Sequence, residues 1–85
     1  MLRYLDIEEK DFNTVYNQIT ENIKKMRKER NITQEELALN IGHSSASMIS
    51  KIEAGLENKH YNIKQLFLIS KVLEVPLSKL FEGID

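Results

Sequence analysis

The chain has 85 residues, which is enough for one small hydrophobic core and therefore for a single domain. Its 41% hydrophobic and 29% charged residues, with three glycines and one proline, are typical of an ordered, helix-rich domain and exclude a disordered tail. The net charge of -1 argues against a general polyanion binder, and the absence of cysteine excludes disulfides and thiolate zinc sites.

No stretch approaches the roughly 20 apolar residues that span a bilayer. The amino terminus, MLRYLDIEEKDF, carries acidic residues where a secretory signal has an apolar core. We therefore expect a cytoplasmic protein with no membrane partner.

The first eleven residues have the weakest pattern in the chain. Leu2, Tyr4, Leu5 and Ile7 follow neither a helical nor a strand period. We predict that residues 1–11 form an N-terminal arm or an extra helical turn, with a dimer-forming segment as the alternative, and that residues 12–85 form the domain.

The first predicted helix runs from Phe12 to about Arg30. Apolar residues at spacings of three and four stack on its inner face: Phe12, Val15, Tyr16, Ile19, Ile23 and Met26. Four basic residues are interpreted mainly as its solvated face: Lys24, Lys25, Lys28 and Arg30.

A second, short helix is predicted to start after Thr33. Asn31 tolerates the left-handed conformation that ends a helix, and Thr33 with Glu36 forms a T-x-x-E capping box. The inner residues of this helix are Leu37, Ala38 and Ile41. Gly42 is expected to end it, because glycine adopts a positive φ without steric cost.

A third helix follows almost at once and is expected to end at Gly55. Ile52 points inward in this helix, together with either Met48 or Ile49. The residues expected to cap its amino end are Ser44 or Ser45.

Two further helices complete the prediction. Asn62 is expected to cap a fourth helix with the inner residues Ile63, Leu66, Phe67, Ile69, Val72 and Leu73. Pro76 suits the start of a final short helix that carries Leu77, Leu80 and Phe81. No segment alternates long enough to predict a strand, so the predicted fold is all-α with five helices.

Three segments in order carry a resemblance: NIKKMRKERNITQEELALNIG, ISKIEAG and IKQLFLISKVLEVPLSKLF. They resemble the phage repressor and Cro-like helix-turn-helix regulators, also called the xenobiotic-response-element family, over roughly residues 17 to 82. The resemblance implies a five-helix repressor-like DNA-binding domain, in which the second and third helices form the helix-turn-helix. It further implies a sequence-specific transcriptional regulator, acting as a repressor, that reads operator DNA through the third helix in the major groove.

The resemblance also implies site residues and partners. Arg27 and Glu53 fall on a structural ion pair. The positions that match or adjoin the family's DNA contacts are Gln34, Ser44, Ser45, Ala46, Ser47, Ser50, Lys51, Lys59, His60 and Lys64. Lys51 is the one long donor on the third helix, suited to the O6 and N7 acceptors of guanine. The expected partners are double-stranded DNA and a second copy of the chain, and the homodimer seam is expected at Val75, Leu77, Leu80 and Phe81.

The sequence departs from the family pattern at the turn. Six residues, HSSASM, separate Gly42 from Ile49, where five are usual, and His43 stands where an apolar residue usually seals the turn. Either the turn is one residue longer, or Met48 takes the inward position. The first interpretation is favoured, because it alone aligns Ile52, Glu53 and Gly55 with the family.

The sequence also bears on two other function classes. An enzyme is disfavoured, because His43 and His60 have no second ligand at metal spacing and no nucleophile or phosphate-loop motif is present; no catalytic residue, metal or cofactor is expected. A protein-interaction or antitoxin module on the same scaffold is the alternative. It rests on Leu39 and Leu68, which fall at outward positions of their predicted helices.

Overall fold

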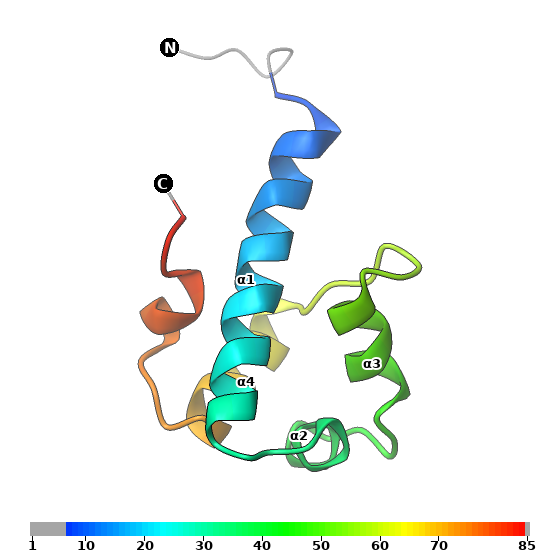
Figure 1. Ribbon diagram of the computed structural model, residues 1–85, viewed down its shortest axis with the longest axis vertical. Helices are drawn as coiled ribbons and strands as arrows, with labels where there is room; N and C mark the ends of the chain where they lie inside the picture. Colours follow the sequence, from blue (N-terminus) through cyan, green and yellow to red (C-terminus); the bar gives the residue numbers. More distant parts are fainter. Residues whose placement is uncertain (1–6, 85) are drawn as a thin grey trace.

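The computed structural model describes residues 7–84, so Leu2, Tyr4 and Leu5 of the predicted arm lie outside the described residues. Within this range no strand occurs, as the predicted all-α fold requires. The elements in chain order are α1 (Glu9–Glu29), α2 (Gln34–Asn40), α3 (Ser47–Ala54), α4 (Ile63–Val72) and the 3-10 helix η2 (Leu77–Phe81) (Figure 1).

The predicted fifth helix is a short 3-10 helix and not an α-helix. Pro76 precedes η2, and Gly83 follows closely with a left-handed φ of 86°. Only five residues therefore lie in helical geometry, too few to propagate the α-helical hydrogen-bond pattern.

Side chains at the first turn explain where two of the α-helices begin. The Thr33 hydroxyl accepts the backbone N–H of Glu36 at 3.0 Å, and the Glu36 carboxylate accepts the N–H of Thr33 at 3.1 Å. Asn62 and Gln65 make the same reciprocal pair at the start of α4, at 2.8 Å in both directions. Both predicted helix starts are confirmed, because each pair satisfies backbone donors that the helix leaves free.

One continuous core lies between α1 and the other elements. Its largest fully buried side chains come from every element: Ile23, Leu37, Ile49, Ile69, Leu73 and Leu80. Ile19 and Met26 of α1 are also buried, in agreement with the predicted inner face of its C-terminal half. The core thus holds α2 and α3 against one long helix.

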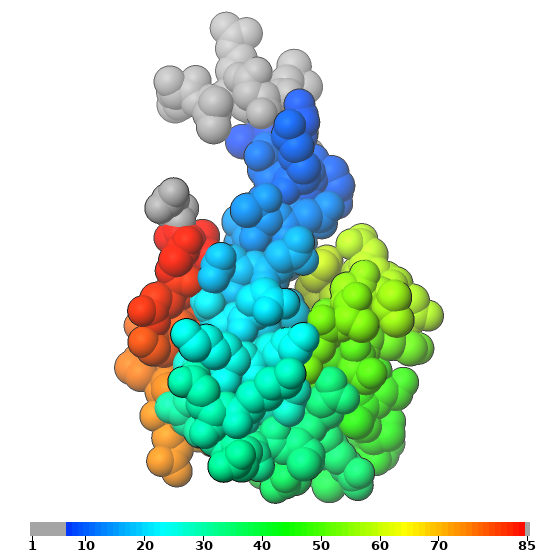
Figure 2. Space-filling view, viewed as in Figure 1, coloured from blue at the N-terminus to red at the C-terminus, as the bar shows by residue number. Residues whose placement is uncertain are grey.

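The N-terminal half of α1 projects beyond this core (Figures 1 and 2). Phe12, Val15 and Tyr16 were predicted to be inner residues, but they are exposed, and the contact given for this part of the helix is the stacking of the His60 ring on one face of Tyr16. Ile63 and Phe67 of α4 were likewise predicted inward and are exposed at 71% and 50%. Periodicity correctly placed Leu66 and Ile69 of α4 in the core.

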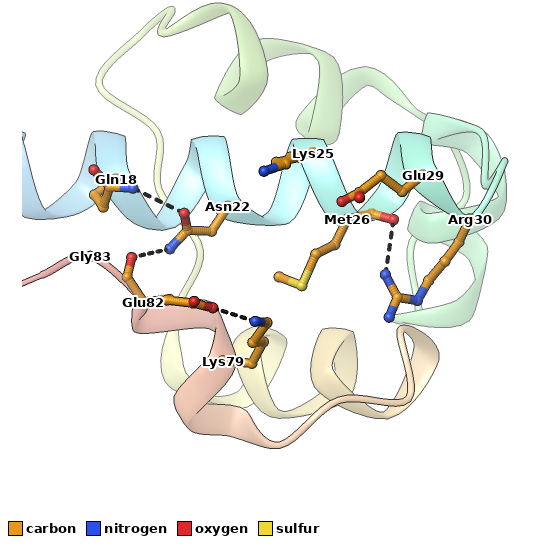
Figure 3. A pocket seen from close by; sticks show the side chains of 9 residues that line it. All are labelled: Gln18, Asn22, Lys25, Met26, Glu29, Arg30, Lys79, Glu82 and Gly83. Atoms are coloured by element: carbon orange, nitrogen blue, oxygen red, sulfur yellow. Dashed lines mark hydrogen bonds and ion pairs between the residues drawn. The ribbon is translucent and has the colours of Figure 1, made fainter.

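A polar clamp fastens the C-terminal segment to α1. The side-chain amide of Asn22 donates to the backbone oxygens of Leu80 at 3.0 Å and Glu82 at 2.8 Å, and Gln18 donates to Asn22 at 3.0 Å. Gln18, Asn22 and Glu82 line an open groove of about 490 Å³ between α1 and residues 79–83 (Figure 3). The clamp positions Leu80 so that its side chain closes the core.

Leu80, one of the four residues of the predicted homodimer seam, is buried in the protomer. The Leu80 side chain is fully buried within the protomer and has no surface to offer a second copy. Val75 and Phe81 are half-buried and pack against the core, and Leu77 is the most exposed residue of the four at 37%. The predicted seam therefore contributes little free apolar surface.

Candidate nucleic-acid interface

A six-residue turn separates α2 from α3 and sets the angle between them. Gly42 begins the turn with a φ of 88°, and the backbone N–H of His43 donates to the carbonyl of Ala38 at 2.9 Å. Leu37 and Ala38 on the inner face of α2 are fully buried, so the two helices approach closely at this point.

His43 seals this turn through polar contacts. Its half-buried ring lies with Nε2 3.3 Å from the side-chain nitrogen of Gln65. Because the Gln65 oxygen accepts the N–H of Asn62, its NH₂ group is the donor toward His43. The same NH₂ group lies 3.4 Å from the Met48 sulfur. A polar network thus stands where the family pattern has an apolar side chain.

The register of α3 follows the longer-turn interpretation. Ile49 and Ile52 are buried, whereas Met48 is only half-buried at the edge of the core. This register places Ser47 and Ser50 on the exposed side of α3, with Lys51 half-exposed beside them.

The predicted serine cap of α3 is wrong. α3 begins at Ser47 with Ala46 at the cap position, and no side chain makes a capping hydrogen bond there. The Ser45 hydroxyl lies 3.4 Å from the Ser47 N–H, which is a long contact. Ser44 and Ser45 are instead exposed in the turn, because the extra residue moves the helix start beyond their reach.

One open hollow gathers several of the predicted DNA-contact residues at the amino end of α3. It encloses about 220 Å³ and is lined by His43, Ser44, Ser45, Ser47, Met48, Lys51 and Lys59. Hydroxyl groups and two ammonium groups thus line a single surface depression, and one of these ammonium groups, that of Lys51, also pairs with a carboxylate outside the lining. Such a lining is suited to hydrogen-bond acceptors and to negative charge.

Lys51 is tied to the loop that follows α3. Its ammonium group lies 3.0 Å from the Glu57 carboxylate, and this hydrogen bond and charge lower the pKa of Glu57. Glu57 and Asn58 both have left-handed φ angles, of 56° and 51°, and Leu56 donates its N–H to the Lys51 carbonyl. The chain therefore reverses directly after α3 and brings an acid back to Lys51. No motif in the sequence signals this contact.

The other predicted contacts are spread over the neighbouring surface. Lys59 and Lys64 are exposed, whereas the His60 ring stacks on Tyr16 with centroids 3.8 Å apart and planes 7° from parallel. One face of His60 is therefore covered by α1. A second open hollow is lined by Lys24, Arg27, Lys28, Gln34, Ser50, Glu53 and Ala54. It places Lys24 and Lys28 of α1 next to Ser50 and Gln34.

A buried ion pair joins α1 to the end of α3. Arg27 Nε and Nη2 donate to the two Glu53 oxygens at 2.8 and 2.9 Å, and the side chains are only 8% and 4% exposed. Arg27 Nη1 also donates to the Ile32 carbonyl at 2.7 Å. Gln34 donates its amide to Glu53 at 2.9 Å, which occupies the amide that was predicted to meet a phosphate. The first residue of α2 and the last turn of α3 are thereby fixed to each other.

The pKa of Glu53 makes this junction sensitive to acid. Burial acts to raise the pKa, but hydrogen bonds from Arg27 and Gln34 and the Arg27 charge outweigh it, so the pKa lies below its ordinary value of 4.5. A lowered carboxylate pKa contributes stability that is present above pH 4.5 and is lost as the pH falls through the folded-state pKa.

We therefore expect Glu53→Gln to flatten the pH dependence of the free energy of unfolding below pH 4.5, measured by urea denaturation at a series of pH values. Glu35→Gln, at an exposed position of α2, serves as the control and should keep the wild-type profile. Equal profiles for Glu53→Gln and the wild type would contradict the role of this carboxylate.

Residues 7–84 contain neither a membrane-spanning helix nor a cluster of possible metal ligands. No helix in this range is both long and apolar enough to cross a membrane. No group of three or more histidine, aspartate and glutamate side chains in the same range forms a possible metal site.

Comparison with known proteins supports the interpretation of these helices. A family model described as Helix-turn-helix, of the Cro/C1 type, matches residues 23–80. No curated protein sequence matches the chain significantly. The match runs from the middle of α1 to η2 and includes α2, the turn and α3. The chain therefore belongs to the Cro/C1-type helix-turn-helix family, whose domains are those of DNA-binding regulators.

Proposed function

We propose that the protein is a sequence-specific transcriptional regulator that reads operator DNA through α3, and that it acts as a repressor. The observation that carries this proposal is the polar hollow at the amino end of α3, where Ser44, Ser45, Ser47, Lys51 and Lys59 converge. A helix with short outward side chains can approach base edges closely in a major groove about 12 Å wide.

The proposed contacts divide into two groups. Ala46, Ser47, Ser50 and Lys51 are assigned to base edges, with Ala46 suited to a thymine methyl group. The residues assigned to DNA phosphates are Gln34, Ser44, Ser45, Lys59, His60 and Lys64. Lys24 and Lys28 are added to this set, because they share a hollow with Gln34 and Ser50. Gln34 is assigned a contact through its backbone N–H, since its amide donates to Glu53.

Two copies of the chain are proposed to bind one operator. A two-fold dimer presents two α3 helices, and successive major-groove faces lie about 34 Å apart along the duplex. The operator is therefore expected to consist of two inverted half-sites. Phosphate contacts from both copies would make binding strongly salt-dependent, even though the net charge of the chain is only -1.

The proposal is tested by titrating the protein with random-sequence duplex DNA and with an operator selected from a pool, at low and moderate salt. Lys51→Ala is expected to weaken operator binding by about ten- to a hundredfold and to relax preference at one base pair. Glu57→Gln should strengthen binding, because it frees Lys51 from its ion pair.

Lys79→Ala is the matched control, since it removes the same charge from η2, outside the proposed DNA surface, where Lys79 pairs with Glu82. Equal losses for Lys79→Ala and Lys51→Ala would move the base-reading role away from Lys51. Absence of any salt-dependent binding would overturn the proposed function itself.

Leu39 favours a second candidate function, that of a protein-interaction or antitoxin module. Its side chain on α2 is 57% exposed, whereas Leu68 is half-buried and packs against the core. A partner bound over α2 would contact the helix-turn-helix itself. If the chain fails to bind DNA, Leu39 is the residue at which to seek such a partner.

A further inference from the structure

A set of exposed apolar side chains on α1 and α4 is not used by the proposed DNA surface. We call it the apolar face: Phe12, Val15 and Tyr16 of α1, with Ile63 and Phe67 of α4. Their exposed fractions range from 38% for Tyr16 to 71% for Ile63. Scattered apolar residues on a surface are common, but a connected set marks an interaction site.

A groove connects the two halves of the apolar face. It encloses about 370 Å³ and is lined by Tyr16, Ile19, Thr20, His60, Tyr61, Asn62, Ile63, Leu66 and Phe81. Phe12 lies one helical turn before Tyr16, and Phe67 lies one turn after Ile63. The face therefore extends continuously from the projecting half of α1 across the groove to α4.

The exposed apolar area is close to what a stable dimer needs. From the exposed fractions, the five side chains present on the order of 450 Å² of surface. A standard interface buries about 800 Å² per partner, of which roughly 60% is apolar, or about 500 Å². The face can therefore supply the apolar part of one interface.

Charges at the two ends of the apolar face are complementary. The start of α1 carries Glu8, Glu9 and Asp11, with Lys10 as the only base. On α4, Lys64 and Lys71 flank the exposed side chains, and the Lys71 ammonium lies 5.1 Å from the centre of the Phe67 ring. An acidic helix end and a basic helix surface thus border the same patch. In a two-fold arrangement each end meets its opposite in the other copy.

We propose that a second copy of this chain occupies the apolar face. The projecting halves of two α1 helices pack antiparallel about a two-fold axis, with Phe12 of each copy directed to the groove of the other. The acidic start of each α1 then lies over Lys71 of the partner. This assignment rests on the proposed dimeric action and moves the seam from the last helix, where Leu80 is buried, to α1 and α4.

Sedimentation velocity of the full chain without DNA, over a wide concentration range, tests the assignment. The wild type is expected to dimerise, and Phe12→Gln and Phe67→Gln are each expected to raise the dimer dissociation constant about tenfold or more. Leu39→Gln and Leu56→Gln are matched controls, because these leucines are equally exposed at 57% and 55% but lie outside the face. Lys71→Glu should also weaken the dimer, whereas Lys28→Glu should not.

Thermal unfolding of each variant confirms that the protomer is folded, which is expected because the substituted side chains are exposed. A wild type that stays monomeric overturns both the face and the proposed dimer. If Phe12→Gln and Phe67→Gln leave the dimer intact but Leu77→Gln or Leu39→Gln dissociates it, the proposed dimer stands. Its assignment to the apolar face is then overturned. Since DNA is absent from the measurement, a failure of DNA binding remains a separate result.

Discussion

Arg27→Met is expected to destabilise the domain by about 3 to 5 kcal/mol, because it leaves the buried Glu53 carboxylate without its cation. A domain of this length has a total stability of roughly 5 to 10 kcal/mol, so the loss is a large part of the total. Urea denaturation followed by far-UV circular dichroism measures the loss.

The double variant Arg27→Met with Glu53→Leu is expected to recover part of this stability, since no charge then remains buried. Recovery should be incomplete, because the Ile32 carbonyl and the Gln34 amide each lose a partner in the core. Lys28→Ala, at an exposed position on the same helix, is the control and should change stability little. A loss below about 1 kcal/mol for Arg27→Met would mean that the pair behaves as a solvated surface contact.

Ile49→Ala is expected to cost about 2 to 5 kcal/mol, because Ile49 is fully buried and its truncation leaves a cavity between α3 and the core. Met48→Ala should cost less than half as much, since Met48 is half-buried and reaches the core only at its edge. The comparison, by urea denaturation of both variants, determines the register of α3. Only with Ile49 inward do Ser47 and Ser50 face outward.

A larger loss for Met48→Ala than for Ile49→Ala would shift α3 by one residue and remove the present assignment of its outward side chains. Ser50→Ala is a suitable control, because Ser50 is exposed on the same helix. Its stability should stay within about 0.5 kcal/mol of the wild type.

Local signals in the sequence predicted most of the helix boundaries. Thr33 with Glu36, and Asn62 with Gln65, satisfy backbone donors within a few residues, so their role does not depend on the rest of the fold. Gly42 and Gly55 adopt the positive φ angles that their positions require. These interactions are short-range, so they can be predicted from the sequence.

Burial was predicted less well, for a physical reason. Helical periodicity shows which residues share a face, but it does not show how far the neighbouring elements extend along the helix. Ile19 and Ile23 are covered, whereas Phe12 and Tyr16 on the same stripe stay exposed, with only the His60 ring against one face of Tyr16. The ion pair between Lys51 and Glu57 was also beyond prediction. It depends on the left-handed backbone of Glu57 and Asn58, two consecutive loop residues that are not glycine.

The clamp between Asn22 and the C-terminal segment has a consequence for synthesis on the ribosome. Asn22 bonds to residues 58 and 60 positions later, and Leu80 is the last fully buried core residue in chain order. Chains grow at about 5 to 20 residues per second, so Asn22 is made several seconds before the segment that it binds. Until then the part of α1 that η2 covers stays open to other chains and to chaperones. The domain is therefore expected to complete its folding only after Leu80 and Glu82 have left the exit tunnel.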